Sequence, residues 1–241
     1  FNRMGMFNNL VNKNYTEAEQ YGNELLANAP DSVISDIDLQ NIGHVEDGLK
    51  NYDKAIEFYK KSLAKKDNND IRKFIYDAYS EMGDVDNAVA VYKEYVEKNP
   101  AKSNNDYSEL ANIYTTAAGK TTDAAKKVDY LKKADGVFAE YIEKYPTLAD
   151  YGVYMRAKIN ENLDPDYTKG TAKPFWEDLI AKVTSHTEKG SNDDAYLKQA
   201  YFYMGAYFYT AGKKDEGDGF WKKLLELDPN NATAKQALGV K

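Results

Sequence analysis

The sequence predicts an all-α fold, a solenoid of about six helical hairpins followed by a C-terminal capping helix. Three observations lead to this prediction. The apolar and small residues of 42–59 recur 33 residues later over 75–92, a period in the range of stacked helical repeats. Small and aromatic residues alternate at helical spacing within the copies. Four of the six prolines fall where the second helix of a hairpin should end, because proline cannot continue the hydrogen-bond ladder of a helix.

The third copy of the pattern is the most complete. It has a turn glycine at Gly83, a small residue at Ala88, an aromatic residue at Tyr92 and a closing Pro100. A small residue lets two helix backbones approach closely, and an aromatic ring fills the space beside it. Residues 70–102 are therefore predicted to form one hairpin.

The two copies before it follow the same order. The first places the small residue Ala18 in its second helix and ends at Pro30. The second pairs Gly43 with Tyr59 and has Asp67 where the closing proline would stand. These copies predict hairpins over residues 1–31 and 36–69.

The later copies are less regular. In the fourth, extra residues over 115–129 separate the two helices and are predicted to extend one or both of them. The fifth is the weakest, and its Pro174 is tolerable only in the first turn of a helix or at a kink. The sixth places Gly205 and Trp221 at packing positions. The predicted ranges are 104–147, 148–186 and 195–230, with the cap over 231–241.

This order of apolar residue, small residue, aromatic residue, turn glycine, alanine, aromatic residue and closing proline resembles the tetratricopeptide repeat (TPR). The resemblance covers almost the whole chain and points to a bacterial TPR-containing protein. It implies a right-handed α-α superhelix. It also implies a non-enzymatic scaffold that binds a protein or peptide in its concave groove.

Composition argues against several function classes. The chain has 39 acidic and 32 basic residues and a net charge of -7, which disfavours binding to nucleic-acid phosphates. It has no cysteine, and no apolar stretch approaches the length of a membrane span. The only histidines, His44 and His186, lack the partner at helical spacing that a zinc site needs. No catalytic residue, metal or cofactor is expected.

Two short segments look like ligand loops but are better explained as helix ends. Residues 119–121 resemble the end of a P-loop, yet Tyr114 stands where that motif needs glycine, so a turn between helices is predicted. Residues 67–70 resemble a calcium loop, yet Arg72 stands where its glycine is required. Residues 67–70 are therefore predicted to cap a helix that begins near Ile71.

In proteins that resemble this one, the first helices of successive hairpins line the concave face. Carrying that register over predicts a groove that is acidic at one end and aromatic at the other, and hence a ligand with basic and apolar portions. Asp77 and Glu109 would repel a carboxylate ligand, so a carboxylate clamp is not expected. The predicted lining is Gln40, His44, Asp47, Lys73, Asp77, Glu81, Glu109, Asn112, Arg156, Asn160, Phe202, Tyr203 and Tyr209.

The aromatic run over residues 196–209 has two interpretations. Its rings pack between helices, or Phe202, Tyr203 and Tyr209 anchor an apolar or sugar-like ligand. The second interpretation gives an alternative function, a carbohydrate-binding bacterial envelope protein built on TPR helices. The segment 163–176 is similar to segments of TPR proteins from bacterial cell envelopes, which favours the periplasm or envelope over the cytoplasm. Because the chain starts inside a predicted helix, further sequence is expected upstream.

Overall fold

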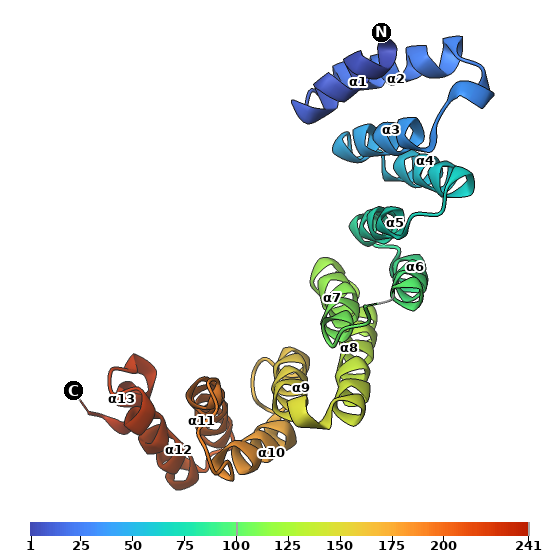
Figure 1. The fold of residues 1–241 in the computed structure, drawn as a ribbon. Helices are drawn as coiled ribbons and strands as arrows, with labels where there is room; N and C mark the ends of the chain where they lie inside the picture. The colour runs from blue at the N-terminus through green and yellow to red at the C-terminus, as the bar shows by residue number, and fades with distance from the viewer. Residues whose placement is uncertain (100, 241) are drawn as a thin grey trace. The chain divides into compact units, whose positions relative to one another are not determined.

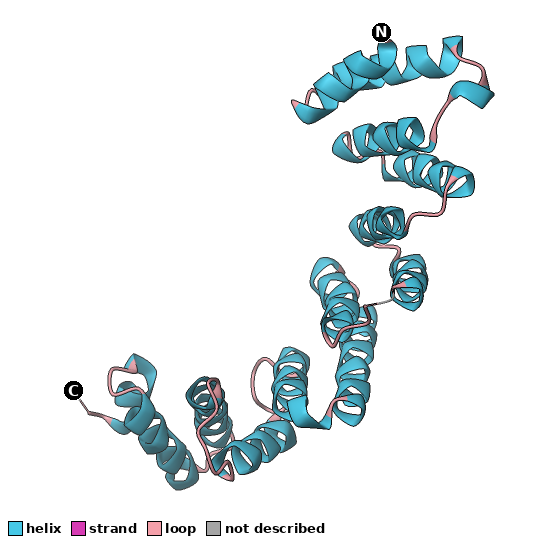
Figure 2. Cartoon of the chain, viewed as in Figure 1, coloured by secondary structure: helices cyan, strands magenta, loops and turns pink. Residues whose placement is uncertain are grey.

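The computed structural model describes residues 1–99 and 101–240. Over these residues the chain forms thirteen α-helices and two short 3-10 helices, and no strand (Figures 1 and 2). The predicted all-α fold of about six hairpins and a terminal helix is confirmed. Pro100, which was expected to close the third hairpin, lies outside the described residues.

The chain divides into two compact units. Unit 1 is Phe1–Asp106 and unit 2 is Tyr107–Lys241. One continuous stack over the whole chain stays a prediction, and each unit is described by itself.

Unit 1 contains three helical hairpins. Neighbouring helices in the chain pack against each other, as α3 and α4 do side by side in Figure 1. A 3-10 helix, Asp31–Val33, joins the first hairpin to the second. The helices are α1 (Asn2–Val11), α2 (Tyr15–Asn28), α3 (Asp36–Gly48), α4 (Tyr52–Lys65), α5 (Asn69–Met82) and α6 (Val85–Lys98).

Unit 2 contains the other three hairpins and the terminal helix, although α7 begins two residues before the unit does. Its first hairpin is longer than those of unit 1, as the extra residues over 115–129 predict. A 3-10 helix, Pro146–Leu148, leads into the second hairpin. The helices are α7 (Asn105–Lys120), α8 (Ala124–Lys144), α9 (Ala149–Leu163), α10 (Lys173–Thr184), α11 (Asp193–Thr210), α12 (Lys214–Leu227) and α13 (Ala232–Leu238).

The seams within hairpins pair a small residue with a large ring. A Cβ atom added to Gly43 would lie 2.5 Å from the ring of Tyr59, and one added to Gly205 would lie 2.6 Å from the ring of Trp221. Tyr59 is fully buried, as is Ala88 in the third hairpin. The repeat pattern thus marks positions where only a small side chain permits the close approach of two helices.

Helix ends follow the expected capping chemistry. Ser35 and Asp38 form a reciprocal capping box at the start of α3. Gly83 ends α5 in a left-handed conformation with φ of 78°, which glycine adopts without strain. Pro174 lies in the first turn of α10, where a missing N–H is tolerated.

The two segments that resemble ligand loops have structural roles. The Asn68 side chain caps α5, and Asp67 pairs with Arg72 and Lys98, which supports the interpretation as a helix start. The prediction of a turn over residues 119–121 is partly wrong. Gly119 and Lys120 belong to the last turn of α7, because burial of Ala117 and Ala118 extends that helix further than expected.

Candidate ligand-binding cleft

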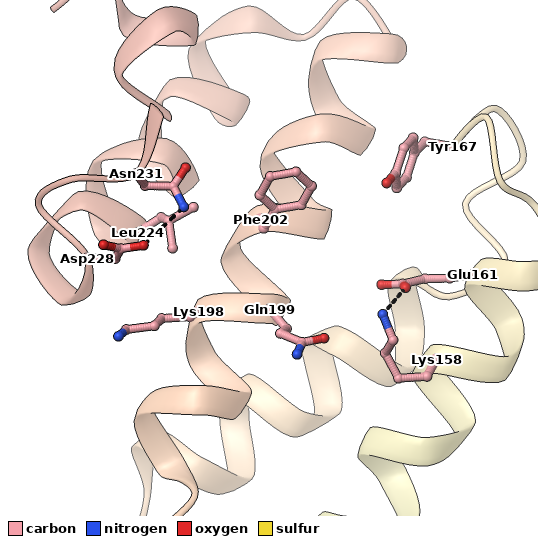
Figure 3. A pocket seen from close by; sticks show the side chains of 9 residues that line it. All are labelled: Lys158, Glu161, Tyr167, Lys198, Gln199, Phe202, Leu224, Asp228 and Asn231. Atoms are coloured by element: carbon pink, nitrogen blue, oxygen red, sulfur yellow. Dashed lines mark hydrogen bonds and ion pairs between the residues drawn. The ribbon is translucent and has the colours of Figure 1, made fainter. Parts of the chain in front are cut away.

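A cleft of about 330 Å³ lies within unit 2 between α9, the α9–α10 loop, α11 and the junction of α12 with α13 (Figure 3). The helices α9 and α11 are the first helices of consecutive hairpins, and both carry residues of the predicted lining. We call it the α9–α11 cleft. It is lined by Lys158, Glu161, Tyr167, Lys198, Gln199, Phe202, Leu224, Asp228 and Asn231.

The apolar part of the cleft comes from Phe202 and Leu224. Figure 3 shows the Phe202 ring projecting from α11 between Leu224 and Tyr167. Phe202 is half-buried, and its ring packs edge-on against Trp221 with 5.3 Å between centroids. Leu224 and Trp221 are buried. The ring therefore has a fixed support on one side and remains accessible on the other.

One wall of the cleft contains an ion pair between two residues of α9, Lys158 and Glu161. The Lys158 ammonium donates to Glu161 Oε2 at 2.6 Å, and the buried indole of Trp176 donates to Glu161 Oε1 at 3.0 Å. Both oxygens of this carboxylate are thus occupied by donors. The Glu161 side chain is 22% exposed, so the pair contributes a half-buried, internally neutralised surface.

Tyr167 forms the rest of this wall and stands on the irregular loop between α9 and α10. Its φ is 58°, an uncommon conformation for a residue with a side chain. Its ring packs against Tyr203 at 5.3 Å between centroids. Burial, followed by the charge of Glu161, raises the pKa of Tyr167.

The Asp164 carboxylate holds this loop in shape. It accepts hydrogen bonds from the backbone N–H groups of Thr168, Lys169 and Gly170 at 2.7 to 3.1 Å, and from the Thr168 hydroxyl at 3.2 Å. Burial opposes the charge on Asp164, but these donors together lower its pKa. Tyr167 lies between Asp164 and the residues that donate to its carboxylate, so these hydrogen bonds fix the backbone on both sides of Tyr167.

The opposite wall carries Lys198 and Gln199 on α11 with Asp228 and Asn231 beyond α12. The Asn231 amide donates to Asp228 Oδ2 at 3.1 Å while its oxygen caps α13. Within the described residues, no carboxylate lies within ion-pair distance of Lys198. This wall therefore contains a cation without a partner.

In unit 1, the structure brings Gln40 and His44 together on α3. The two imidazole nitrogens of His44 lie 2.8 Å from the Tyr59 hydroxyl and 3.2 Å from the Gln40 amide. The Phe74 ring lies edge-on at 4.5 Å between centroids. Burial lowers the pKa of His44. These contacts make His44 a packing residue of the α3–α5 seam.

The predicted acidic residues of unit 1 also lie near one another. Partial burial, followed by the charges of Asp77 and Glu81, raises the pKa of Asp47. Lys73 donates to Asp77 at 3.2 Å and to the Tyr76 hydroxyl at 3.0 Å. Burial works against the Lys73 charge, but these partners raise its pKa overall. The α3 and α5 faces thus share one acidic surface.

The other predicted residues of unit 2 have separate surroundings. Glu109 and Asn112 line a hollow of about 260 Å³ between α7 and α9. Arg156 makes a bidentate pair with Asp135, both bonds 2.9 Å, and Asn160 donates to the same carboxylate at 2.8 Å. Asn160 is buried, so it joins α8 to α9 and is not available to a ligand.

Two of the predicted aromatic anchors are packing residues. Tyr203 is 1% exposed and lies in the core beside Trp176, so its predicted place on a ligand surface is wrong. The Tyr209 hydroxyl donates to Asp218 and its oxygen lies 3.0 Å from the carbonyl oxygen of Ala237, which places it at the contact of α11 with α12 and α13. Of the three predicted anchors, Phe202 is the one that lines the α9–α11 cleft.

Sequence reasoning missed most of the cleft. Lys158, Glu161, Lys198 and Gln199 lie within one helical turn of predicted groove residues on the same helices, and this spacing could have identified them. Tyr167 gave no comparable signal, because it belongs to an irregular loop.

No helix in the described part of the chain has the length and apolar character needed to cross a membrane. Residues 1–99 and 101–240 also contain no group of three or more histidine or carboxylate side chains placed to hold a metal ion.

Family models of the tetratricopeptide repeat match residues 39–64 and 77–101. Residues 39–64 and 77–101 are thus tetratricopeptide repeats. The matched segments are the predicted second and third hairpins, where the signature residues are most complete. No curated protein sequence matches the chain.

Solved structures of other tetratricopeptide repeat proteins are similar to the chain over nearly its whole length. The C-terminal part of a TPR repeat-containing protein from Cytophaga hutchinsonii is 23% identical, with 99% of each chain covered and a TM-score of 0.44. A TPR repeats protein from Bacteroides fragilis is 17% identical, with 98% of this chain and 94% of that chain covered and a TM-score of 0.47.

Proposed function

We propose that this chain is a protein- or peptide-binding scaffold that holds its ligand on the face formed by the first helices of its hairpins. The tetratricopeptide repeats support an interaction scaffold, and such repeats are typically non-enzymatic. Within unit 2, the ligand occupies the α9–α11 cleft.

The observation that carries this proposal is the accessible Phe202 ring on a rigid support. An aromatic side chain offers a large contact area and loses little conformational entropy on binding, so such rings often dominate binding energy. Here Trp221 fixes the ring from behind, and the volume of about 330 Å³ is at the small end of ligand sites. That size suits one or two side chains of a partner segment.

Site-specific photo-crosslinking tests this placement. A benzoylphenylalanine at Gln199, an exposed cleft residue, should crosslink to a partner protein in a lysate of the source organism. The same group at Lys132, an exposed position on α8 outside the cleft, is the matched control. Equal crosslinking of one partner from both positions, or from Lys132 alone, would move the binding surface away from the cleft.

A carbohydrate ligand is the second candidate, and it is favoured because Phe202 and Tyr167 line the same cleft as the carboxylate and amide groups of Glu161, Gln199, Asp228 and Asn231. Sugar rings stack on aromatic faces while their hydroxyls bond to such acceptors. A glycan array read with the wild type and Phe202→Ala separates the two candidates. Specific glycan binding that Phe202→Ala abolishes would favour the carbohydrate function.

We also propose a bacterial periplasmic or envelope location. The absence of cysteine is compatible with it, and the α9–α10 segment resembles segments of envelope TPR proteins. Cell fractionation of the source organism against periplasmic and cytoplasmic markers tests this. Recovery with the cytoplasmic marker would contradict it.

A further inference from the structure

We propose that the α9–α11 cleft recognises a single acidic residue beside an apolar residue in a segment of the partner protein. This inference rests on the proposed scaffold function and specifies the ligand of that site. The sequence predicts a ligand with basic and apolar portions, and this inference adds an acidic group to that ligand.

The position of the acidic group follows from Lys198. Among the charges that line the cleft, the ammonium of Lys158 is matched by Glu161, whereas Lys198 lies within ion-pair distance of no carboxylate in the described residues. Lys198 is half-buried, so part of its side chain is held against the protein. A ligand carboxylate would supply the missing partner through a charge-assisted hydrogen bond.

The two lining carboxylates restrict how much negative charge the cleft accepts. Glu161 already receives donors from Lys158 and Trp176, and Asp228 receives the Asn231 amide. A second ligand carboxylate would find no further unpaired cation among the lining residues. The cleft therefore favours one acidic residue over an acidic run.

The apolar group follows from Phe202 and from the rigidity of the wall opposite it. Tyr167 is held by the loop that Asp164 closes through four donated hydrogen bonds, and its ring rests on Tyr203. An apolar side chain between Phe202 and Tyr167 would contact two rings that are already fixed. Little conformational entropy is then lost in forming the site.

The test is selection of random peptides displayed on phage against the full chain, followed by calorimetry with the selected peptides. We expect enrichment of an aspartate or glutamate adjacent to a large apolar residue. Lys198→Glu should weaken binding about tenfold or more, as expected for loss of a charged hydrogen bond, and Lys198→Gln should weaken it less. Lys132→Glu, the same charge reversal on the exposed face of α8, should leave the dissociation constant unchanged.

The outcomes separate the inference from the proposed function. Selected peptides that bind through Phe202 but carry no acidic residue, or that are insensitive to Lys198→Glu, would overturn the charge assignment and leave the scaffold function intact. Peptides whose affinity is unchanged by both Lys198→Glu and Phe202→Ala would overturn the cleft as their site. A selection without enrichment would overturn recognition of a short linear segment, while crosslinking at Gln199 would still report on the scaffold function.

Discussion

Replacement of Gly205 by alanine tests the close approach of α11 to α12. The new Cβ would lie 2.6, 2.7 and 2.9 Å from three atoms of the Trp221 ring, distances that force movement. Trp221 is 2% exposed and packs against Phe202 and Tyr209, so it has little room to move. Overpacking of this kind costs about 1–3 kcal/mol.

The helix itself gains from the same change. Replacing glycine with alanine inside a helix stabilises it by about 0.5–1 kcal/mol, so the net loss for Gly205→Ala lies between about 0 and 2.5 kcal/mol. Gly219→Ala in α12 is the matched control, because an added Cβ there meets no atom within 4 Å. It should gain stability by about 0.5–1 kcal/mol.

Urea unfolding followed by tryptophan fluorescence measures this difference. Both tryptophans, Trp176 and Trp221, lie in unit 2, so the signal reports that unit. The account predicts that Gly205→Ala is less stable than Gly219→Ala by about 1–3 kcal/mol. Equal stability of the two variants would refute the close approach as the reason for a small residue at this position.

Three further predictions concern titratable groups. The imidazole nitrogens of His186 lie 2.9 Å from Asp193 and 3.0 Å from Asp150, and the hydrogen bond to Asp193 contributes most to raising the pKa of His186. His186→Gln should therefore lower the melting temperature most below about pH 6.5, and this loss should shrink as the pH rises through the raised pKa. A loss that does not vary with pH would contradict this bridge. Asp164→Asn should cost about 1–3 kcal/mol at pH 7 by urea unfolding, and because the pKa of Asp164 is lowered, the difference should fade as pH falls through that pKa. Asp47→Asn should do the opposite, because the raised pKa of Asp47 means that its charge destabilises the fold. By urea unfolding, the variant should be slightly more stable than the wild type at pH 7, and this gain should disappear in acid. A loss of stability at pH 7 would show that the neighbours of Asp47 attract its charge.

The hairpins could be predicted because their signals are local. Gly43 with Tyr59 and Gly205 with Trp221 follow fixed spacings, and each pair forms within one hairpin. Proline and capping residues act on the helix end beside them. Such features depend on neighbours in sequence, so the order of helices is readable without the structure.

The cleft was less predictable because it depends on contacts between hairpins. Residues 201–203 are all aromatic, so helical periodicity does not separate the buried Tyr203 from the accessible Phe202. The roles of Asp164 and Tyr167 depend on a loop with no repeat signature. The isolation of Lys198 is visible only once the positions of all carboxylates around it are known.

The affinity of the partner captured through Gln199 tests the central claim most directly. Phe202 and Phe220 are both half-buried rings packed against the same core cluster, but Phe220 does not line the α9–α11 cleft. Phe202→Ala should raise the dissociation constant of the partner about tenfold or more by calorimetry, while Phe220→Ala should leave it nearly unchanged. Equal losses in the two variants, or no loss in Phe202→Ala, would contradict the cleft as the binding site.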